Sequence, residues 1–317
     1  MSLFTQMPVE QYAADAVAGF GNTAAFDLGV ARSLAWMSQL AYETDTAKIG
    51  EICGKLQISL AGDPIHRSVS TGLPIASTYA LVLDLGEAMV VSFAGTDPVL
   101  LANWVSDFDI RPAEGGAAKG FSVALKAVEK DILTQLPTDR PVMVTGHSLG
   151  GALAVLLAQR LATMKHDVTA VYTFGMPRPG RRDFSDPYNQ GPLAARTFRF
   201  VHGDDIVPTV APSKPLGFRH VGRLVAAPTG GKFTVPSEAV DSDQPLFAKG
   251  IAAELREFLH HPLAVAGAFG NQLRGVVKAL SGRASTGTRT DLAGITIEML
   301  PPRIRHHLPD QYIAACS

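Results

Sequence analysis

The chain has 317 residues, of which 46% are hydrophobic and 18% are charged, a composition that allows a compact globular protein with a sizeable core. Its 28 basic and 29 acidic residues leave a formal net charge of −1, which argues against nucleic-acid binding and against electrostatic steering of a charged partner. No apolar run approaches the roughly 18 residues of a membrane span. The sequence also lacks a zinc-ligand cluster and a phosphate-cradling glycine loop, so we expect no metal and no organic cofactor.

The N-terminus and the cysteines bear on where the protein works. The first residues, Met1–Pro8, lack the basic patch and long apolar core of a signal peptide. Cys53 and Cys316 lie near opposite ends of the sequence, and we expect two free thiols, as in a reducing compartment. These features predict a cytoplasmic protein, or one secreted by a route that the sequence does not show. They indicate no particular oligomeric state.

Hydrophobic periodicity predicts alternating strands and helices along the chain. The expected helices are 27–42, 121–136 and 149–161. The expected strands are 77–84 and 88–93, which form a hairpin, followed by 142–144, 167–174, 196–202 and 218–226. Strands that alternate with helices after a leading hairpin indicate an α/β fold with a mostly parallel central sheet and helices on both faces.

One stretch, Val142–Gly151, places a serine between a strand and a helix. Its centre, Gly146–Gly150, reads Gly-His-Ser-Leu-Gly and matches the Gly-x-Ser-x-Gly nucleophile elbow in the strand–turn–helix context that this motif requires. We expect strained backbone angles at Ser148 and crowding between the two flanking glycines. The helix N-terminus that follows favours a developing negative charge. The pattern therefore indicates a nucleophilic serine, the alternative being a chance match in a loop.

Polar, turn-forming clusters follow four of the predicted strands. Sites in parallel sheets are usually built where the strands end. The clusters are 93–96, 146–150, 174–178 and 202–208.

Together these segments resemble the class 3 lipases, the family of the fungal triacylglycerol lipases. The matching pieces, in family order, are Val91–Thr96, Asn103–Phe108, Gly146–Gly151, Tyr172–Gly180 and Asp205–Pro208. The resemblance covers about residues 25–225 and the C-terminal tail. It implies an α/β-hydrolase fold with a lid or cap element. One departure is an alanine at position 94, where these enzymes commonly have arginine; we expect an altered polar contact there and an intact oxyanion site.

The resemblance also implies a set of roles. Ser148 is the expected nucleophile, Asp205 in the Asp-Ile-Val-Pro segment the expected acid, and His307 the expected base. The backbone N–H of Leu149, directly after the nucleophile, and Thr96 are expected to form the oxyanion hole.

The base is the most open assignment. His307 keeps the five-residue step to Tyr312 of the family's His-x-x-x-x-Tyr pattern at the start of a final helix, whereas His306 does not. His220 is a third candidate, although it resembles a family position that precedes a strand.

Three further residues are weaker candidates. Asp204 is an alternative acid, but the match to the residues after Asp205 favours Asp205. His202 precedes the acid, whereas the family's base follows it. His147 belongs to the elbow, and we expect its side chain to point away from the working face of Ser148.

Two segments are candidates for covering the acyl site. Residues 97–105 stand where the family carries a short amphipathic lid, and an exposed apolar surface there would suit opening at a lipid–water interface. Packing beneath the sheet edge is the alternative. We treat 1–317 as one α/β-hydrolase domain with a helical insertion at about 240–290, predicted as helices 246–259 and 262–281. This insertion either borders the acyl pocket or is an embellishment elsewhere.

The resemblance thus implies a lipase or carboxylesterase that hydrolyses acylglycerols or other carboxylic esters through an acyl-enzyme, without cofactor or metal. Short-chain, phospholipase A1-type and feruloyl-type esterases share this constellation and are the rival enzymes. A catalytically silent lipid-binding protein on the same fold is the rival from another class.

Overall fold

The structure, a computed structural model, describes residues 5–68, 77–96, 111–214, 216–236 and 302–317. The described residues on both sides of the 237–301 gap belong to one compact unit. The predicted lid at 97–105 and the predicted insertion at about 240–290 lie outside the described residues. The single-domain assignment therefore stays a prediction.

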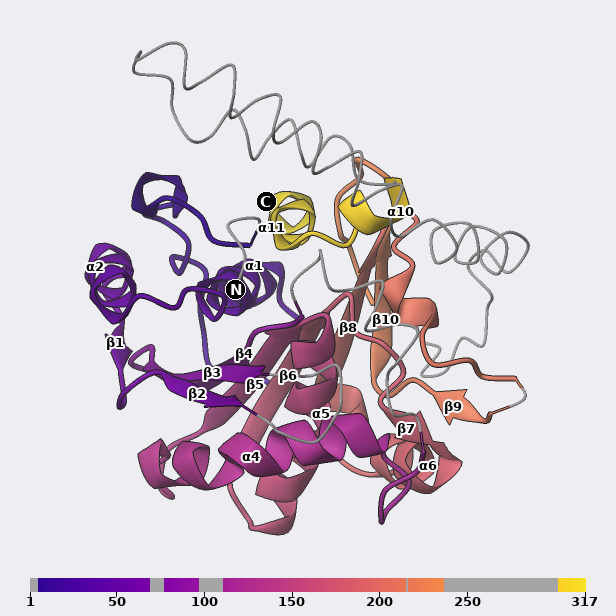
Figure 1. Cartoon of the computed structure of the whole chain (residues 1–317). Coiled ribbons are helices and arrows are strands. Elements are labelled where there is room, and N and C mark those ends of the chain that lie inside the picture. The colour runs from indigo at the N-terminus through magenta and orange to yellow at the C-terminus, as the bar shows by residue number, and fades with distance from the viewer. Residues whose placement is uncertain (1–4, 69–76, 97–110, 215, 237–301) are drawn as a thin grey trace, which may run out of the picture. The chain divides into compact units, whose positions relative to one another are not determined.

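A mixed sheet of eight strands forms the centre of the described part (Figure 1). Its strands are β1 Ser59–Leu60, β2 Ile65–Ser68, β3 Ser77–Asp84, β4 Met89–Phe93, β5 Val142–His147, β6 Val168–Phe174, β8 Thr197–His202 and β10 Arg223–Ala227. They run in the order β1-β3-β4-β5-β6-β8-β10, with β2 paired to β3. Strands β4, β5, β6, β8 and β10 pair in parallel, whereas β3 is antiparallel to β1, β2 and β4. The predicted mostly parallel sheet and its leading hairpin are confirmed.

Helices cover both faces of this sheet (Figure 1). They are α1 Leu28–Leu40, α2 Thr46–Leu56, α4 Lys119–Gln135, α5 Leu149–Thr163, α6 Arg182–Gln190, α10 Pro302–Arg305 and α11 Pro309–Cys316. Helices α4 and α5 bury their apolar residues in one core with one face of the sheet. Helices α1, α2 and α11 bury theirs in a second core with the opposite face. Among the described helices, none is long and apolar enough to cross a bilayer.

Local sequence explains where several of these elements begin. The Asp27 carboxylate accepts a hydrogen bond from the Val30 N–H at 2.9 Å and so caps α1. Strand β5 is buried along its whole length, as expected for a short apolar run in a parallel sheet. Helix α5 follows it after a single residue, and its apolar residues are buried almost all round, which fits a helix enclosed by the core.

The predicted strand at 218–226 is wrong as a single element. Phe218–Arg219 forms β9, which pairs with β7 (Gly180–Arg181) in a separate two-stranded sheet, and only Arg223–Ala227 joins the main sheet as β10. The chain turns between them at Gly222, whose φ of +74° is a left-handed conformation that favours glycine. Apolar residues on both sides of Gly222 concealed this turn.

Candidate active site

Ser148 occupies a sharp turn between β5 and α5. Its φ of 57° and ψ of −129° are strained for a non-glycine residue, as the elbow motif predicts. A Cβ on Gly146 would lie 2.3 Å from the carbonyl carbon and oxygen of Gly150, so a side chain cannot fit there. The Ser148 N–H donates to the Phe174 carbonyl at 2.8 Å, which joins the turn to the end of β6. Strand, turn and glycines together fix the serine at the carboxyl edge of the sheet.

Asp205 and His307 meet beyond the carboxyl end of β8. The His307 Nδ1–H donates to Asp205 Oδ2 at 2.8 Å, and the side chains of both residues are almost completely buried. Two more donors hold the carboxylate, since the Val207 N–H bonds Oδ1 at 2.9 Å and the Tyr312 hydroxyl bonds Oδ2 at 2.5 Å. Residues separated by 102 positions in the sequence therefore form one buried acid–base pair.

Gly175 provides the space in which this pair sits. It follows β6 with a φ of +63°, and a Cβ there would lie 2.8 Å from His307 Nδ1 and 2.9 Å from Asp205 Oδ2. Its N–H donates to the Phe200 carbonyl of β8. The backbone of this loop thus forms the floor beneath the aspartate–histidine pair, next to the residue that holds the Ser148 N–H.

Ser148 Oγ and His307 Nε2 are both buried, and neither has a hydrogen-bond partner among the described residues. The bond to Asp205 places the proton of a neutral His307 ring on Nδ1, so that Nε2 is the nitrogen of that form that can accept a proton. A hydroxyl that can lose a proton and a nitrogen that can accept one are therefore both buried and uncommitted. A general base needs such a nitrogen, free to accept a proton, before reaction.

Thr96 and Leu149 follow the ends of two neighbouring strands, β4 and β5. Thr96 follows β4 and is half-buried, and Phe93 of β4 pairs with Gly146 of β5. A Cβ on Gly150, in the first turn of α5, would lie 2.4 Å from the Phe93 carbonyl oxygen, so this turn packs directly on the end of β4. Leu149 is the first residue of α5, where backbone N–H groups have no partner within the helix.

The alternative bases, His306 and His220, do not take part in the Asp205–His307 pair. His306 Nδ1 accepts a hydrogen bond from the Asp204 N–H at 3.1 Å. His220 Nε2 donates to the Pro208 carbonyl at 2.8 Å. Burial, reinforced by the positive charges of Arg199 and Arg178, holds the pKa of His220 well below its ordinary value. Neither histidine is bonded to the Asp205 carboxylate.

Two other histidines surround the pair without joining it. His202 is buried at the end of β8, with its ring centre 5.8 Å from that of His306, and burial lowers its pKa. His147 bonds the Tyr42 hydroxyl and the His307 carbonyl, and its ring centre lies 4.5 Å from that of His307. Tyr42 went unnoticed in the sequence because a lone tyrosine after a helix carries no recognisable pattern.

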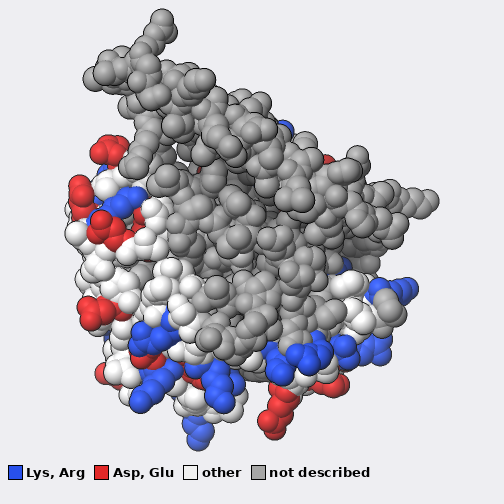
Figure 2. Space-filling view, in the orientation of Figure 1, with Lys and Arg blue, Asp and Glu red and all other residues white. Residues whose placement is uncertain are grey.

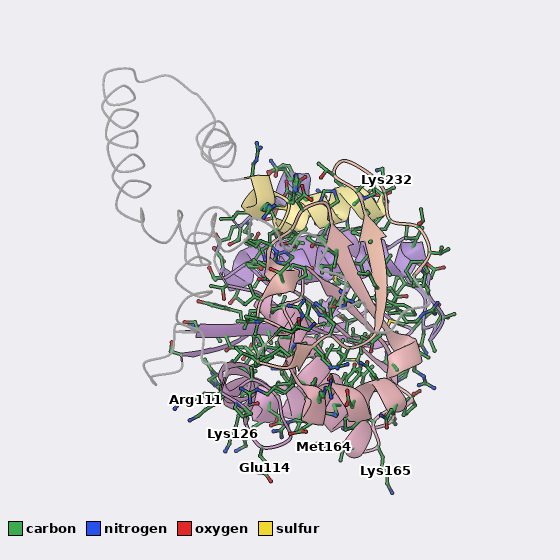
Figure 3. The ribbon with its side chains drawn as sticks, turned by 90° about the vertical axis from the view of Figure 1, so that its right-hand side faces the viewer. Arg111, Glu114, Lys126, Met164, Lys165 and Lys232 are labelled. Carbon is green, nitrogen blue, oxygen red and sulfur yellow. The ribbon has the colours of Figure 1, made fainter. Side chains whose placement is uncertain are left out.

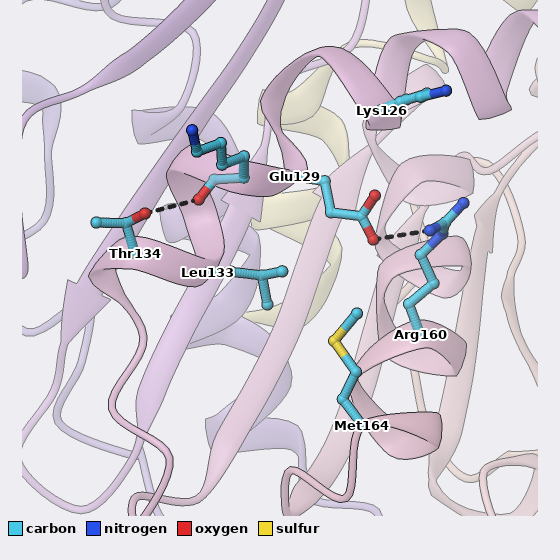
Figure 4. A pocket seen from close by; sticks show the side chains of 7 residues that line it. Lys126, Glu129, Leu133, Thr134, Arg160 and Met164 are labelled. Atoms are coloured by element: carbon cyan, nitrogen blue, oxygen red, sulfur yellow. Dashed lines mark hydrogen bonds and ion pairs between the residues drawn. The ribbon is translucent and has the colours of Figure 1, made fainter.

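A pocket of about 560 Å³ lies elsewhere, on the surface between α4 and α5 (Figure 4). Its lining residues are Lys126, Glu129, Lys130, Leu133, Thr134, Arg160 and Met164. Arg160 pairs with Glu129 at 2.9 Å. In Figure 2, Lys and Arg side chains gather along the lower edge of the molecule. Figure 3 shows Lys126 and Met164 at the opposite end of the described part from α11. Because Met164 follows the last turn of α5 and Ser148 precedes its first, the pocket lies about 20 Å from the nucleophile.

The remaining expectations concern metals and thiols. Within the described ranges, no group of three or more His, Cys, Asp or Glu side chains is arranged to hold a metal ion. Cys53 and Cys316 are both buried and free. Burial raises the pKa of the Cys53 thiol to about 11 and that of Cys316 to about 12, so neither is a reactive thiolate near neutral pH.

Comparison with known sequences finds a family match over the region that holds Ser148 and Asp205. Residues 90–214 match the family model described as lipase (class 3). A lipase of Caenorhabditis elegans is 33% identical over 192 residues, which are 56% of this chain and 54% of the relative. A secreted mono- and diacylglycerol lipase of Malassezia restricta is 37% identical over 108 residues, which are 32% of this chain and 35% of the relative. The chain thus spans about half or less of the length of these relatives.

Solved structures agree with the fold. Lipase II from Rhizopus niveus has a TM-score of 0.52 and 21% identity, with 75% of this chain and 87% of that chain covered. A deletion mutant of the Rhizomucor miehei lipase in its propeptide complex has a TM-score of 0.52 and 22% identity, with 67% and 70% covered. The predicted α/β-hydrolase fold and the predicted resemblance to class 3 lipases are both confirmed.

Proposed function

We propose that this chain, whose residues 90–214 match the class 3 lipase family model, is a serine ester hydrolase that cleaves acylglycerols or related lipid esters through an acyl-enzyme. Ser148 is the nucleophile, His307 the general base and acid, and Asp205 the residue that orients the imidazole. The relatives named as lipases support the reaction class.

The observation that carries this proposal is the buried aspartate–histidine pair together with two uncommitted atoms. Asp205 holds the proton on His307 Nδ1 through the 2.8 Å bond and thereby leaves Nε2 free to accept a proton. The buried Ser148 hydroxyl is the group that has a proton to give. A weak nucleophile such as a serine hydroxyl needs this kind of adjacent base.

These positions support the following reaction. His307 Nε2 takes the proton as Ser148 Oγ attacks the ester carbonyl, and the imidazolium is stabilised by the Asp205 carboxylate. The same proton then passes to the leaving alcohol. A water molecule, activated by His307, attacks the acyl-serine and releases the carboxylic acid.

The tetrahedral intermediate needs donors for its oxyanion. The Leu149 N–H at the start of α5 points along a helix dipole that favours negative charge, and Thr96 follows the adjacent strand. We assign the oxyanion hole to these two residues. Each such donor contributes about 3 kcal/mol to stabilising a transition state in well-studied hydrolases.

Labelling with a fluorophosphonate probe tests the assignment of the nucleophile. We expect one adduct, at Ser148, in the folded chain, and loss of both the adduct and ester hydrolysis by at least about 10⁴-fold in Ser148→Ala. Circular dichroism of the variant serves as the folding control. Absence of any adduct in folded wild-type protein would favour the silent lipid-binding alternative.

Substrate preference separates a lipase from its rival esterases. Rates on p-nitrophenyl esters of increasing chain length, and on an emulsified triglyceride above and below its solubility limit, would distinguish them. A lipase is expected to prefer the emulsified substrate. Activity confined to dissolved short-chain esters would instead support a soluble esterase with the same nucleophile.

A further inference from the structure

The elbow histidine lies at the junction of three segments that are far apart in the sequence. Successive side chains of a strand face opposite sides of the sheet, so Met143, Thr145 and His147 of β5 share one face. Met143 packs in the core formed with α1 and α11, and Thr145 donates to the Leu34 carbonyl of α1. His147 therefore points into the space between α1 and the C-terminal segment, and its side chain is buried.

Both ring nitrogens of His147 are engaged there. Nε2 lies 2.5 Å from the backbone carbonyl oxygen of His307, and Nδ1 lies 2.7 Å from the Tyr42 hydroxyl. A carbonyl oxygen can only accept, so Nε2 carries the proton and donates it. Burial and the neighbouring His307 hold the pKa of His147 well below its ordinary value, so the ring is neutral and Nδ1 accepts from Tyr42.

The His147 ring also supports the neighbouring rings. Its centre lies 4.5 Å from that of His307 and 5.7 Å from that of Tyr312, the residue whose hydroxyl bonds Asp205. A cationic ring at this distance would repel the imidazolium that His307 becomes during reaction. A neutral ring does not, and it still donates to the backbone that carries the base.

We propose that His147 and Tyr42 are positioning residues: the Tyr42 hydroxyl selects the Nε2–H form of His147, which then anchors the main chain of His307 so that its imidazole keeps its place between Asp205 and Ser148. This inference rests on the proposed function of His307 as the base. It assigns the variable position of the Gly-x-Ser-x-Gly motif in this chain a role in catalysis without contact with substrate.

Three variants separate the anchor from simple core packing. His147→Phe keeps a buried ring but removes both hydrogen bonds. Tyr42→Phe keeps the ring and removes only the hydroxyl that donates to Nδ1. His147→Gln keeps an acceptor oxygen for Tyr42 and a donor nitrogen for the carbonyl.

We expect kcat to fall about 10- to 100-fold in His147→Phe and about 3- to 10-fold in Tyr42→Phe, because small displacements of a catalytic group are costly. KM should stay within about threefold, since neither residue contacts substrate. His147→Gln should retain most of the activity. Rates are normalised to the folded fraction by circular dichroism.

Proton NMR of the same proteins measures a resonance that a packing defect elsewhere would leave unchanged. The His307 Nδ1–H bonded to Asp205 should give a low-field resonance that shifts or broadens in His147→Phe and Tyr42→Phe. It should stay in place in His147→Gln. If His147→Phe does not fold, the test relies on Tyr42→Phe, which is then compared with the wild type and with His147→Gln.

Two results would overturn the anchor. One is an unchanged kcat together with an unchanged His307 resonance in Tyr42→Phe or His147→Phe. The other is a loss in His147→Gln as large as in His147→Phe. Ser148→Ala and His307→Ala, assayed in parallel, keep the two proposals distinguishable: if these remain active, the proposed function itself fails, whereas if they are inactive and Tyr42→Phe is unaffected, only the anchor fails.

Discussion

The elbow around Ser148 and the C-terminal segment 302–317 reach the site by different physical means. The elbow is local, because one strand, one strained residue and two mutually packed glycines define its shape. The C-terminal segment ends in α11, a helix of 8 residues that is too short to be stable alone. Contacts with distant residues hold it, including Tyr312 to Asp205 and the backbone bond from the Phe233 N–H to the Ala315 carbonyl.

This contrast predicts different failures in the two regions. Damage to the elbow should destabilise the whole fold, because β5 and α5 lie at its centre. Damage to the C-terminal segment should leave the fold in place and misplace His307, the proposed base. Stability and activity can therefore be measured separately to tell the two regions apart.

The largest effect on activity is expected at His307, the proposed base. His307→Ala should lower kcat/KM for ester hydrolysis by at least about 10⁴-fold while changing the melting temperature little. His306→Ala is the matched variant one residue away, and it loses only the bond that its ring accepts from the Asp204 N–H. We expect it to retain activity within about tenfold. Inactivation by His306→Ala alone would show that the base was assigned to the wrong residue.

The next largest effect is on the stability of the elbow. In Gly146→Ala the new Cβ would lie 2.3 Å from backbone atoms of Gly150, so the turn has to open, at a cost of about 3 kcal/mol of unfolding free energy. Gly54→Ala, in α2, is the control, since its Cβ would meet nothing within 4 Å. Helix propensity predicts that this control is more stable by about 0.5–1 kcal/mol. Urea unfolding measures both, and equal stabilities would contradict the crowding argument.

The smallest effect concerns the stability of the fold at acidic pH and depends on His147, the residue that joins the two regions. Burial keeps the pKa of His147 well below 6.5 in the folded chain, whereas the unfolded chain binds a proton below that pH. Unfolding therefore takes up a proton, and His147 makes the fold lose about 1.4 kcal/mol per pH unit as the pH falls below about 6.5. His147→Gln should remove this contribution to the dependence of the unfolding free energy on pH. Urea unfolding at about pH 7.5 and about pH 5.5 compares the two proteins, and identical slopes would refute a neutral His147.

The difference between the local elbow and the distant contacts of the C-terminal segment also determines what could be predicted from the sequence. The elbow is contiguous, so its strand, strained serine and crowded glycines followed from ten residues. The pairing of Asp205 with His307 depended on the family resemblance, because no local pattern links residues 102 positions apart. Tyr42 and the break between β9 and β10 were missed, since neither a lone tyrosine nor a single glycine between two short segments has a distinctive signal. The helices α2 and α6 were likewise not predicted.

The bonds of His147 have a consequence for the order of folding. They join residues 105 and 160 positions apart, so the order in which chain segments meet matters at this point. The strand and helix that flank Ser148 can form from neighbouring residues, but the His307 backbone finds its donor only after both the α1 end and the last 16 residues have docked. In a refolding experiment, secondary structure should therefore return before esterase activity, and the appearance of activity would time the final docking step.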